Sequence, residues 1–510
     1  MNTNYALDNP ISIILDKPRT DFTRNDLLHI IELRQIEKIT FHYTGLDGKL
    51  KELKLPVANR EQAERILAGG ERVDGSSLFK GLIDTSVSDL YVVPIFKTAF
   101  INPMDETSLD FICRYINKDG EMASFALDTI LHKAHELFKQ STGYELYALG
   151  ELEFYLIGST DNPLYPVSKQ KGYHASAPFI KSGTIVNEIV KHLTQITGCI
   201  KYAHNEVGYV NKTRSDLPEI NGKPAEQIEV EFLPAPITDM ADYLVLARWL
   251  IRNIAYKHGY IATFTPKIEE GIAGNGYHFH MALMKNGKNM MTDDDGRLSK
   301  PAHKLIGGLC HYADSLTAFG NTTSSAYLRL VPNQEAPVRI CWSELNRSAM
   351  IRVPLGWPKN TDLSSKINDQ NDPKYIDPVG RQTIELRSPD GSANTHLLLA
   401  GITMAAEWGL TTDDSINVAN KLHVTGNIFD KKRTEFPALP RSCSESASVL
   451  ISNQDKYIRN NIFPPEMIEY VTSILNNEND KDINKYLADL PADDRLHETR
   501  KIMHKDLHRH

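Results

Sequence analysis

The chain has 510 residues, 41% of them hydrophobic and 24% charged, and its formal net charge is -8. This composition is typical of a globular protein with a large core and two or more domains. Because nucleic-acid binders need clustered Lys and Arg, and no basic run occurs, we expect no nucleic-acid partner. The five cysteines lie far apart without a C-x-x-C pair, so they indicate neither a disulfide framework nor a zinc cluster.

The sequence carries no signal for export or membrane insertion. Residues 1–18 include a short apolar patch, but they lack a charged n-region and a small-residue cleavage site. Nowhere do about 18 apolar residues run together, as a membrane-spanning helix needs. We therefore predict a cytoplasmic protein that does not enter the membrane.

The first predicted element is a β-hairpin over residues 36–57. Ile39, Phe41 and Tyr43 alternate with polar residues, Asp47-Gly48 supplies a turn, and the alternation then resumes. This hairpin begins a small α+β domain. We expect the domain to end near residue 105, just before another strand at residues 109–116.

Amphipathic helices are predicted at residues 124–140 and 240–258, with period-2 strands between and after them. Such an alternation implies an α+β catalytic domain in which helices cover the outside of a curved sheet. Residues 358–380, rich in Asn, Asp, Ser and Lys, are a predicted surface insertion. The predicted organisation is an N-terminal extension at 1–35, the small domain at 36–105, the catalytic domain at 106–450 and a helical C-terminal tail at 451–510.

Four predicted strands carry ionisable residues at alternate positions, with apolar or aromatic residues between them. Side chains alternate between the two faces of a strand, so each strand presents its carboxylates or imidazoles on one face. One such strand could be a solvated strand, whereas four suggest a sheet whose concave face is a polar cavity. The strands are Glu151-Leu-Glu-Phe154, Gln227-Ile-Glu-Val-Glu-Phe232, Tyr277-His-Phe-His280 and Ile384-Glu-Leu-Arg387.

Carboxylates with an occasional imidazole are the ligands that Mg²⁺ and Mn²⁺ prefer, and such ions are often paired where phosphoryl groups are transferred. Any one Glu taken alone is better explained as an exposed strand residue. Their joint occurrence favours a metal site. Six candidate ligands, enough for two ions, are Glu151, Glu153, Glu206, Glu229, His278 and Glu385.

Arg329, Arg347, Arg352 and Arg387 supply the complementary charge. They fall in or beside apolar, strand-like stretches, where an unpaired guanidinium would be costly to bury. Some would form structural salt bridges to nearby carboxylates. The others would bind a substrate carboxylate or a phosphate chain in bidentate fashion.

Two further polar or glycine-containing segments have simple explanations. Residues 271–276 resemble part of a dinucleotide fingerprint, but a strand follows them, so we expect a loop that approaches a ligand closely. No G-x-x-x-x-G-K-[ST] sequence occurs, which excludes a P-loop. Asp74-Gly-Ser-Ser77 on its own is a turn. It could serve chemistry only where the small domain meets a catalytic cavity.

The ordered motifs of the chain resemble those of type I glutamine synthetases from about residue 36 to residue 450. The resemblance implies the glutamine synthetase fold, α+β, with a small β-grasp-like N-terminal domain and a large catalytic domain built on a curved antiparallel sheet. The matching motifs are Val73-Asp-Gly-Ser-Ser77, Ser88-Asp89, Gly150-Glu-Leu-Glu-Phe154, Lys171-Gly-Tyr173, His204-Asn-Glu-Val207, Phe264-Thr-Pro-Lys267, Gly274-Asn-Gly-Tyr-His278, Arg329-Leu-Val-Pro332, Glu335-Ala-Pro337, Asn346-Arg-Ser-Ala349 and Pro389-Asp390.

The resemblance also implies an activity and its cofactors. ATP would phosphorylate glutamate on its γ-carboxylate, and ammonia would attack the γ-glutamyl phosphate, giving glutamine, ADP and phosphate. Two or more Mg²⁺ or Mn²⁺ ions would assist. By resemblance, Glu153, Glu206 and Glu229 would hold one ion, and Glu151, His278 and Glu385 the other.

Other residues match family positions that bind substrates. Arg329 would grip the α-carboxylate of glutamate, Arg387 would face its γ-carboxylate, and Gly274 would lie beside its amino group. The predicted ATP-binding residues are His280, Arg347 and Arg352, of which Arg347 would also be catalytic.

The ammonium site would be shared between subunits. Asp74 and Ser77 would come from a neighbouring subunit, and Asp74 would help to deprotonate ammonium. Glu335 would lie on a flap that shields the acyl phosphate from water, because an exposed acyl phosphate would be hydrolysed. The implied assembly is a homo-oligomer of stacked rings, a dodecamer or a decamer.

Some positions depart from the family. Residues 208–224 look like an inserted loop, and Phe429 stands in a segment resembling one that carries a modified tyrosine, so adenylylation there is chemically impossible. A solvated helix best explains His497, His504 and His508.

Two alternatives remain open: a γ-glutamyl-amine synthetase acting on a polyamine or methylamine, and a catalytically silent homologue. Retention of Asp74-Gly-Ser-Ser77 favours ammonia, and the full set of ligands and arginines argues against a silent copy.

Overall fold

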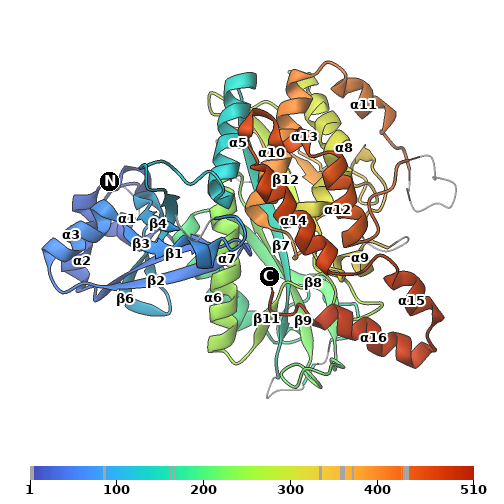
Figure 1. Ribbon diagram of the computed structural model, residues 1–510, viewed down its shortest axis with the longest axis horizontal. Coiled ribbons are helices and arrows are strands. Elements are labelled where there is room, and N and C mark those ends of the chain that lie inside the picture. Colours follow the sequence, from blue (N-terminus) through green and yellow to red (C-terminus); the bar gives the residue numbers. More distant parts are fainter. Residues whose placement is uncertain are drawn as a thin grey trace.

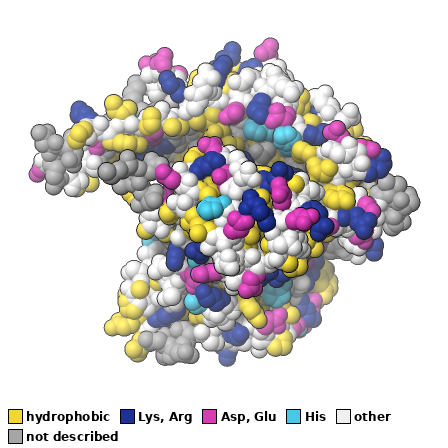
Figure 2. Space-filling view, turned by 90° about the vertical axis from the view of Figure 1, so that its left-hand side faces the viewer, with side chains coloured by type: hydrophobic (Ala, Val, Ile, Leu, Met, Phe, Trp, Pro, Cys, Tyr) yellow, Lys and Arg dark blue, Asp and Glu magenta, His cyan; other side chains and the backbone are white. Residues whose placement is uncertain are grey.

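The computed structural model describes residues 5–83, 88–159, 164–165, 167–331, 336–356, 362–369, 373–426, 428 and 436–509. A small sheet lies near the N-terminus, and a large sheet accompanied by long helices forms the rest (Figure 1). Of the helices in the described ranges, none combines the length and the apolar character that crossing a bilayer requires. On the face seen in Figure 2, acidic and basic side chains are interspersed rather than separated by sign.

The small sheet has the strand order β2-β1-β6-β4-β3, with β5 beside β6. The predicted hairpin is confirmed, because β1 and β2 are antiparallel, with Lys38 opposite Pro56 and Thr44 opposite Leu50. The strands are β1 Lys38–Thr44, β2 Leu50–Pro56, β3 Glu71–Asp74, β4 Asp89–Pro94, β5 Phe100–Asn102 and β6 Asp105–Ile116, and the helices are α1 Pro10–Leu15, α2 Arg24–Arg34, α3 Arg60–Gly69 and α4 Gly75–Leu78.

Strand β6 lies in the middle of this sheet, although its residues 109–116 follow the expected domain boundary at residue 105. It pairs in parallel with β1 and antiparallel with β4. Leu109 lies beside Ile39 and Phe111 beside Phe41, and all four side chains are fully buried. The small sheet therefore extends past the expected boundary, because its core includes the side chains of β6.

Within the described residues the large sheet has 10 strands, and its main path runs β14-β15-β16-β12-β7-β9-β8. The pairs along this path are antiparallel except β14 and β15, which are parallel. The strands are β7 Glu145–Ile157, β8 Ile200–Val210, β9 Ala225–Phe232, β10 Ala235–Pro236, β11 Ile261–Thr263, β12 Tyr277–Lys285, β13 Lys288–Asn289, β14 Trp342–Glu344, β15 Ile351–Val353 and β16 Ile384–Leu386.

Both predicted helices are found, as α5 Leu127–Thr142 and α7 Ile237–Lys257. Both pack against β7, and α10 (Thr395–Thr411) packs between α5 and α8 (Lys300–Gly320) (Figure 1). The described part of the predicted insertion at 358–380 is mostly exposed. The other helices are α6 Gly183–Thr197, α8 Lys300–Gly320, α9 Ala326–Arg329, α10 Thr395–Thr411, α11 Ser415–Lys421, α12 Cys443–Ser452, α13 Asp455–Ile458, α14 Pro465–Asn477, α15 Ile483–Asp489 and α16 Ala492–His504.

A buried cluster of charges joins the small sheet to the helices behind the large one. Arg114 of β6 places Nε 3.1 Å from Asp128 of α5 and Nη2 2.5 Å from Asp242 of α7. Burial alone would raise the pKa of Asp242, but Arg114 and the nearby His396 of α10 outweigh it and hold that pKa at about 2. A single guanidinium thus links β6 to two helices of the large domain.

We expect Arg114→Met to lower the free energy of unfolding by about 3–5 kcal/mol, because it leaves two buried carboxylates without their cation. The midpoint of urea unfolding, followed by tryptophan fluorescence, measures the loss. The exposed pair of Lys118 and Asp119 provides a control, since Lys118→Met should change stability by less than about 1 kcal/mol. Equal midpoints for Arg114→Met and the native protein would contradict the expected role of the cluster.

Candidate active site

Cross-strand pairing brings the acidic residues of the large sheet together. Glu153 of β7 lies opposite Glu229 of β9, and Glu151 lies opposite Glu231. On the other side of β7, Glu151 lies opposite His278 of β12. Because directly opposed residues have Cβ atoms about 4.5–5.5 Å apart, the register itself concentrates carboxylates on one face of the sheet.

Glu206 reaches the same face through an irregularity in β8. The pairing of β8 with β9 is regular from Tyr202 to Asn205, and the register then shifts before Tyr209. Glu206 lies within the shift, with Oε1 3.9 Å from Nδ1 of His204. An irregularity of this kind can re-aim a side chain, and here it directs Glu206 toward the other carboxylates.

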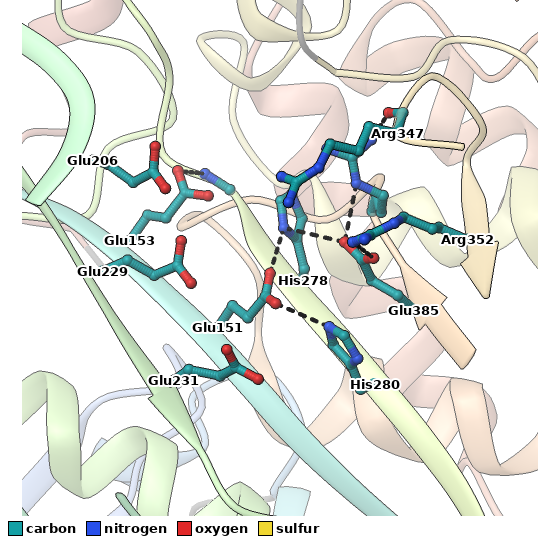
Figure 3. A network of polar contacts seen from close by, with 12 residues as sticks. Glu151, Glu153, Glu206, Glu229, Glu231, His278, His280, Arg347, Arg352 and Glu385 are labelled. Carbon is teal, nitrogen blue, oxygen red and sulfur yellow. Dashed lines mark hydrogen bonds and ion pairs between the residues drawn. The ribbon is translucent and has the colours of Figure 1, made fainter. Parts of the chain in front are cut away.

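These strands line a cavity of about 820 Å³. Figure 3 shows Glu151, Glu153, Glu206, Glu229 and Glu231 along one side of it, with the imidazoles, arginines and Glu385 across from them. The predicted site residues that line the cavity are Glu151, Glu153, Glu206, Glu229, Gly274, His278, His280, Arg329, Arg347, Arg352, Glu385 and Arg387.

Asp74 and Ser77 do not line the cavity of their own chain. They lie at the start of α4 in the small domain, where both are exposed. Asp74 accepts hydrogen bonds from the backbone N–H of Ser76 at 2.9 Å and from Oγ of Ser77 at 2.6 Å. Hydrogen bonds from these two serines lower the pKa of Asp74 to about 2, so it is ionised at neutral pH. Glu335 lies outside the described residues.

Among the described residues, three groups of side chains could each hold a cation, because one ligand atom from each member lies within 4.8 Å of the others. Carboxylate and imidazole donors of this kind suit Mg²⁺ or Mn²⁺. The groups share members, so they describe overlapping parts of one acidic wall. They are Glu151, His278 and Glu385; His204, Glu206 and Glu229; and Glu151, Glu229 and Glu231.

The first group is the set predicted for one ion. In the second group, His204 stands where the prediction has Glu153. The Oε2 atom of Glu153 instead accepts hydrogen bonds from the backbone N–H of Gly276 at 2.8 Å and from Nε2 of Gln227 at 3.1 Å. Glu153 nevertheless faces the same space, as Figure 3 shows.

His204 and Glu231 are site residues that the predicted set did not include. Both lie two positions from a predicted ligand on the same strand, His204 before Glu206 and Glu231 after Glu229. The alternation of strand side chains was therefore the signal that could have identified them. Glu231 also pairs with Nζ of Lys201 at 2.5 Å.

The carboxylates of the cavity fall into two electrostatic groups. Burial would raise the pKa of Glu151, but His280 at 2.9 Å and His278 at 2.8 Å outweigh it and hold that pKa well below its usual range. Burial, together with repulsion from Glu206, raises the pKa of Glu153 to about 7. Burial and the neighbouring carboxylates raise the pKa of Glu229 well above its usual range. The opposed pair Glu153 and Glu229 is thus short of positive charge, whereas Glu151 is not.

Glu385 is held by arginines on the opposite wall. It accepts hydrogen bonds from Nη1 of Arg352 at 2.9 Å and from Nε of Arg387 at 3.0 Å. Arg329 is buried, and its Nη1 donates to the carbonyl of Ser388 at 3.1 Å. These contacts orient the guanidinium groups along the cavity.

The loop before β12 lines this cavity, and its close approach to a ligand stays a prediction. A Cβ atom on Gly274 would lie 2.5 Å from the carbonyl oxygen of Pro266, and one on Gly276 would lie 2.6 Å from Nε2 of His278. Any larger residue would push the loop away from Arg329 and His278. Glycine is therefore required here for space rather than for an unusual backbone angle.

Helix α16 supports this loop from outside the cavity. Nε2 of His504 contacts the carbonyl of Ile268 at 2.8 Å, and Arg500 pairs with Glu269 at 2.9 Å. The predicted solvated helix is therefore wrong for His504, which is buried, whereas His497 and His508 are largely exposed. The tertiary contact with the loop removes one face of the helix from solvent.

The fold and the cavity together define a two-domain protein whose curved sheet carries a charged ligand site. The family model of the glutamine synthetase catalytic domain matches residues 129–486, and that of the glutamine synthetase β-grasp domain matches residues 35–118. The chain therefore belongs to the glutamine synthetase family.

Named relatives agree with this family. A glutamine synthetase of Thermotoga maritima is 31% identical over 445 residues, covering 84% of this chain and 90% of that protein. One of Aquifex aeolicus is 28% identical over 484 residues, covering 88% and 93%.

Among solved structures, Plasmodium falciparum glutamine synthetase has a TM-score of 0.73 at 23% identity, covering 93% of this chain and 98% of that one. A structure described as a GmaS/ADP complex has a TM-score of 0.71 at 19% identity, covering 92% and 98%. The predicted fold is confirmed.

We expect Mn²⁺ to raise the thermal unfolding temperature more at pH 8 than at pH 6. Because the folded pKa of Glu153 is raised to about 7, its contribution to the stability of the metal-free protein is lost as the pH rises from about 4.5 through about 7. Above pH 7 a bound cation relieves the repulsion between the ionised Glu153 and its neighbouring carboxylates. Below pH 7 the cation must first displace the proton from Glu153.

Scanning fluorimetry with and without Mn²⁺ measures the difference. Glu153→Gln should flatten the pH dependence, whereas the exposed control Glu106→Gln should preserve it. Equal Mn²⁺ shifts at both pH values in the native protein would contradict the raised pKa.

Proposed function

We propose that this chain is a type I glutamine synthetase, a glutamate-ammonia ligase that forms glutamine, ADP and phosphate from glutamate, ammonia and ATP. The observation that carries the proposal is that one cavity combines carboxylates and imidazoles with Arg329, Arg347, Arg352 and Arg387. This combination suits phosphoryl transfer, in which cations must neutralise charge on the moving phosphoryl group. Membership of the family supports the general reaction.

The donor chemistry of the acidic wall fits two Mg²⁺ or Mn²⁺ ions. We assign Glu153, Glu206 and Glu229 to one ion, following the family resemblance, and Glu151, His278 and Glu385 to the other. The raised pKa of Glu153 and of Glu229 supports this assignment, because it reflects a shortage of positive charge between them. When bound, the ions would polarise the γ-phosphoryl group and neutralise the phosphates of ATP.

In the first step, an oxygen of the glutamate γ-carboxylate attacks the γ-phosphorus of ATP, and ADP leaves. We assign Arg329 to the α-carboxylate of glutamate, Arg387 to its γ-carboxylate, and Gly274 to the space beside its amino group. Arg347 and Arg352, with His280 on the ATP side, would stabilise the negative charge of the phosphates.

In the second step, the nitrogen of ammonia attacks the carbonyl carbon of γ-glutamyl phosphate, and phosphate leaves. Ammonium must first lose a proton. We assign this role to the ionised Asp74, assisted by Ser77, from a neighbouring subunit in a stacked ring of ten or twelve copies. The exposure of both residues in a single chain supports the sharing. Glu335 would lie on the flap that excludes water.

A second candidate keeps the ATP chemistry but uses methylamine or a polyamine. The likeness to the GmaS structure concerns the fold alone and favours neither substrate. Asp74-Gly-Ser-Ser77 supports ammonia, because amine-using relatives tend to lose this pattern. A catalytically silent homologue need not retain the acidic wall and its arginines.

With Mg²⁺ or Mn²⁺, ATP and glutamate, we expect phosphate release to require ammonium. Methylamine and putrescine are tested in parallel. Turnover with either amine but not with ammonium would favour the second candidate, and no turnover with any of them would indicate a silent homologue.

Glu385→Ala should lower kcat by at least about 10²-fold, because it removes a metal ligand and unpairs two arginines. Size-exclusion chromatography checks that the variant still assembles. The exposed control Glu106→Gln should remain active, and a fully active Glu385→Ala would refute the metal assignment.

Mixing two inactive variants tests the shared site. We expect oligomers reassembled from equal amounts of Asp74→Ala and Glu385→Ala subunits to regain activity at about a quarter of the sites, where an intact Asp74 faces an intact Glu385. Each variant is dissociated and reassembled alone as a control. Recovery no greater than in these controls would mean that Asp74 acts within its own chain or not at all.

A further inference from the structure

Three cationic side chains meet at the joint between the small domain and the large one. Lys49, from the turn between β1 and β2, lies with Arg248 and Arg252 of α7 around a cavity of about 200 Å³. This cavity shares no lining residue with the acidic cavity. No role in the proposed reaction falls on it.

The positive charge of this cavity is not balanced by the residues that line it. Asp47 is the one carboxylate among the lining residues that the structure describes, and it already pairs with Nζ of Lys51 at 2.7 Å. Lys49 donates to the backbone carbonyl of His508 at 3.0 Å, which neutralises no charge. Three cations thus face one carboxylate that has another partner.

The two arginines are only partly compensated: Asp390 favours the charged form of Arg248, but burial outweighs it and lowers the pKa of Arg248. Arg248 is only 6% exposed, and its Nη1 donates to the carbonyl of Ala393 at 3.2 Å. Among the described residues, its Nε and Nη2, and Nη2 of Arg252, have no hydrogen-bond partner. The Cζ atom of Arg248 lies 4.6 Å from the ring centre of Tyr277, and that of Arg252 lies 4.9 Å from that of Phe264. Aromatic faces attract cations, but they compensate a buried charge less than an anion does.

We propose that this cavity binds a small oxyanion of the phosphate or sulfate type. Paired guanidinium groups bind such anions through several charge-assisted hydrogen bonds, and a lysine adds a further donor. The volume suits one small anion rather than a nucleotide or a drug-sized ligand, whose pockets measure about 300–1,000 Å³.

The electrostatics of the cluster favour an anion. Burial and the positive charge of Arg248 lower the pKa of Arg252 to about 9. Burial and Arg252 also lower the pKa of Lys49, against the opposing effect of Asp47. A bound dianion would reverse these shifts, because it stabilises the charged form of each group.

The position of the cavity links a bound anion to the loop beside the acidic wall. Phe264 and Tyr277, the rings behind the two arginines, stand at the two ends of the loop that carries Gly274 and Gly276, and Tyr277 directly precedes His278. An occupant would thus hold the hairpin turn, α7 and this loop together.

Calorimetric titration of the full chain with inorganic phosphate, at constant ionic strength set with chloride, tests the proposal. Phosphate could also bind in the acidic cavity, which Arg347 lines, whereas Arg347 does not line the cationic cavity. Binding to the cationic cavity is therefore measured in a protein that carries Arg347→Gln. In that background we expect one remaining class of phosphate sites, and sulfate should compete for it.

Arg252→Gln, added to that background, should weaken the remaining class at least about tenfold. Lys49→Gln, on the half-buried turn, should weaken it in the same direction and covers the case in which Arg252→Gln fails to fold. Lys257→Gln, an exposed residue of the same helix, should leave it unchanged. Three outcomes would overturn the proposal. The protein binds phosphate no more strongly than it binds chloride, or both variants leave phosphate binding unaltered, or the protein binds succinate but not phosphate.

Discussion

Repulsion among the carboxylates on one face of β7, β8 and β9 is the constraint on which the rest of this structure depends. The register opposes Glu153 to Glu229 and Glu151 to Glu231, at distances where like charges destabilise a sheet. A slip of one residue would relieve the repulsion, but it would also expose the alternating apolar side chains, which are fully buried. The hydrophobic face therefore holds the acidic face together, and the repulsion has to be met by cations across the cavity.

The protein's own positively charged and imidazole side chains are distributed unevenly among these carboxylates. Glu151 has His278 and His280, and Glu385 has Arg352 and Arg387, so both carboxylates have cationic or imidazole partners within the protein. The opposed pair on β7 and β9 lacks a comparable arrangement, and its pKa values rise accordingly. A bound metal cation stabilises the site most where the protein's own side chains neutralise the carboxylates least. The side of the cavity with Glu153 and Glu229 thus favours bound cations. The opposite side, with its arginines, suits anionic groups.

How much of the fold and site could be predicted from the sequence depends on how far apart along the chain the interacting residues lie. The alternation in Glu151-Leu-Glu-Phe154 is local, so the polar face of the strand could be read directly. The position of Glu206 depends on a register shift between β8 and β9, and the place of β6 depends on its distant partner β1. His504 looked solvated because its partner, the carbonyl of Ile268, lies in a remote loop. The cluster of Lys49, Arg248 and Arg252 was missed for the same reason, since a turn and a helix form it only after folding.

The loop at residues 264–276 shows how these distant contacts serve the site. Arg248 and Arg252 stack on the rings at its two ends, while α16 contacts Ile268 and Glu269 in its middle. A loop whose glycines leave no room for a Cβ atom keeps its position only if its backbone is held from outside. The match to the family's catalytic domain ends at residue 486, whereas α16 spans Ala492–His504. Part of the support for this loop is therefore supplied by sequence beyond the family match, so a motif comparison finds the glycines but not the helix that keeps them in place.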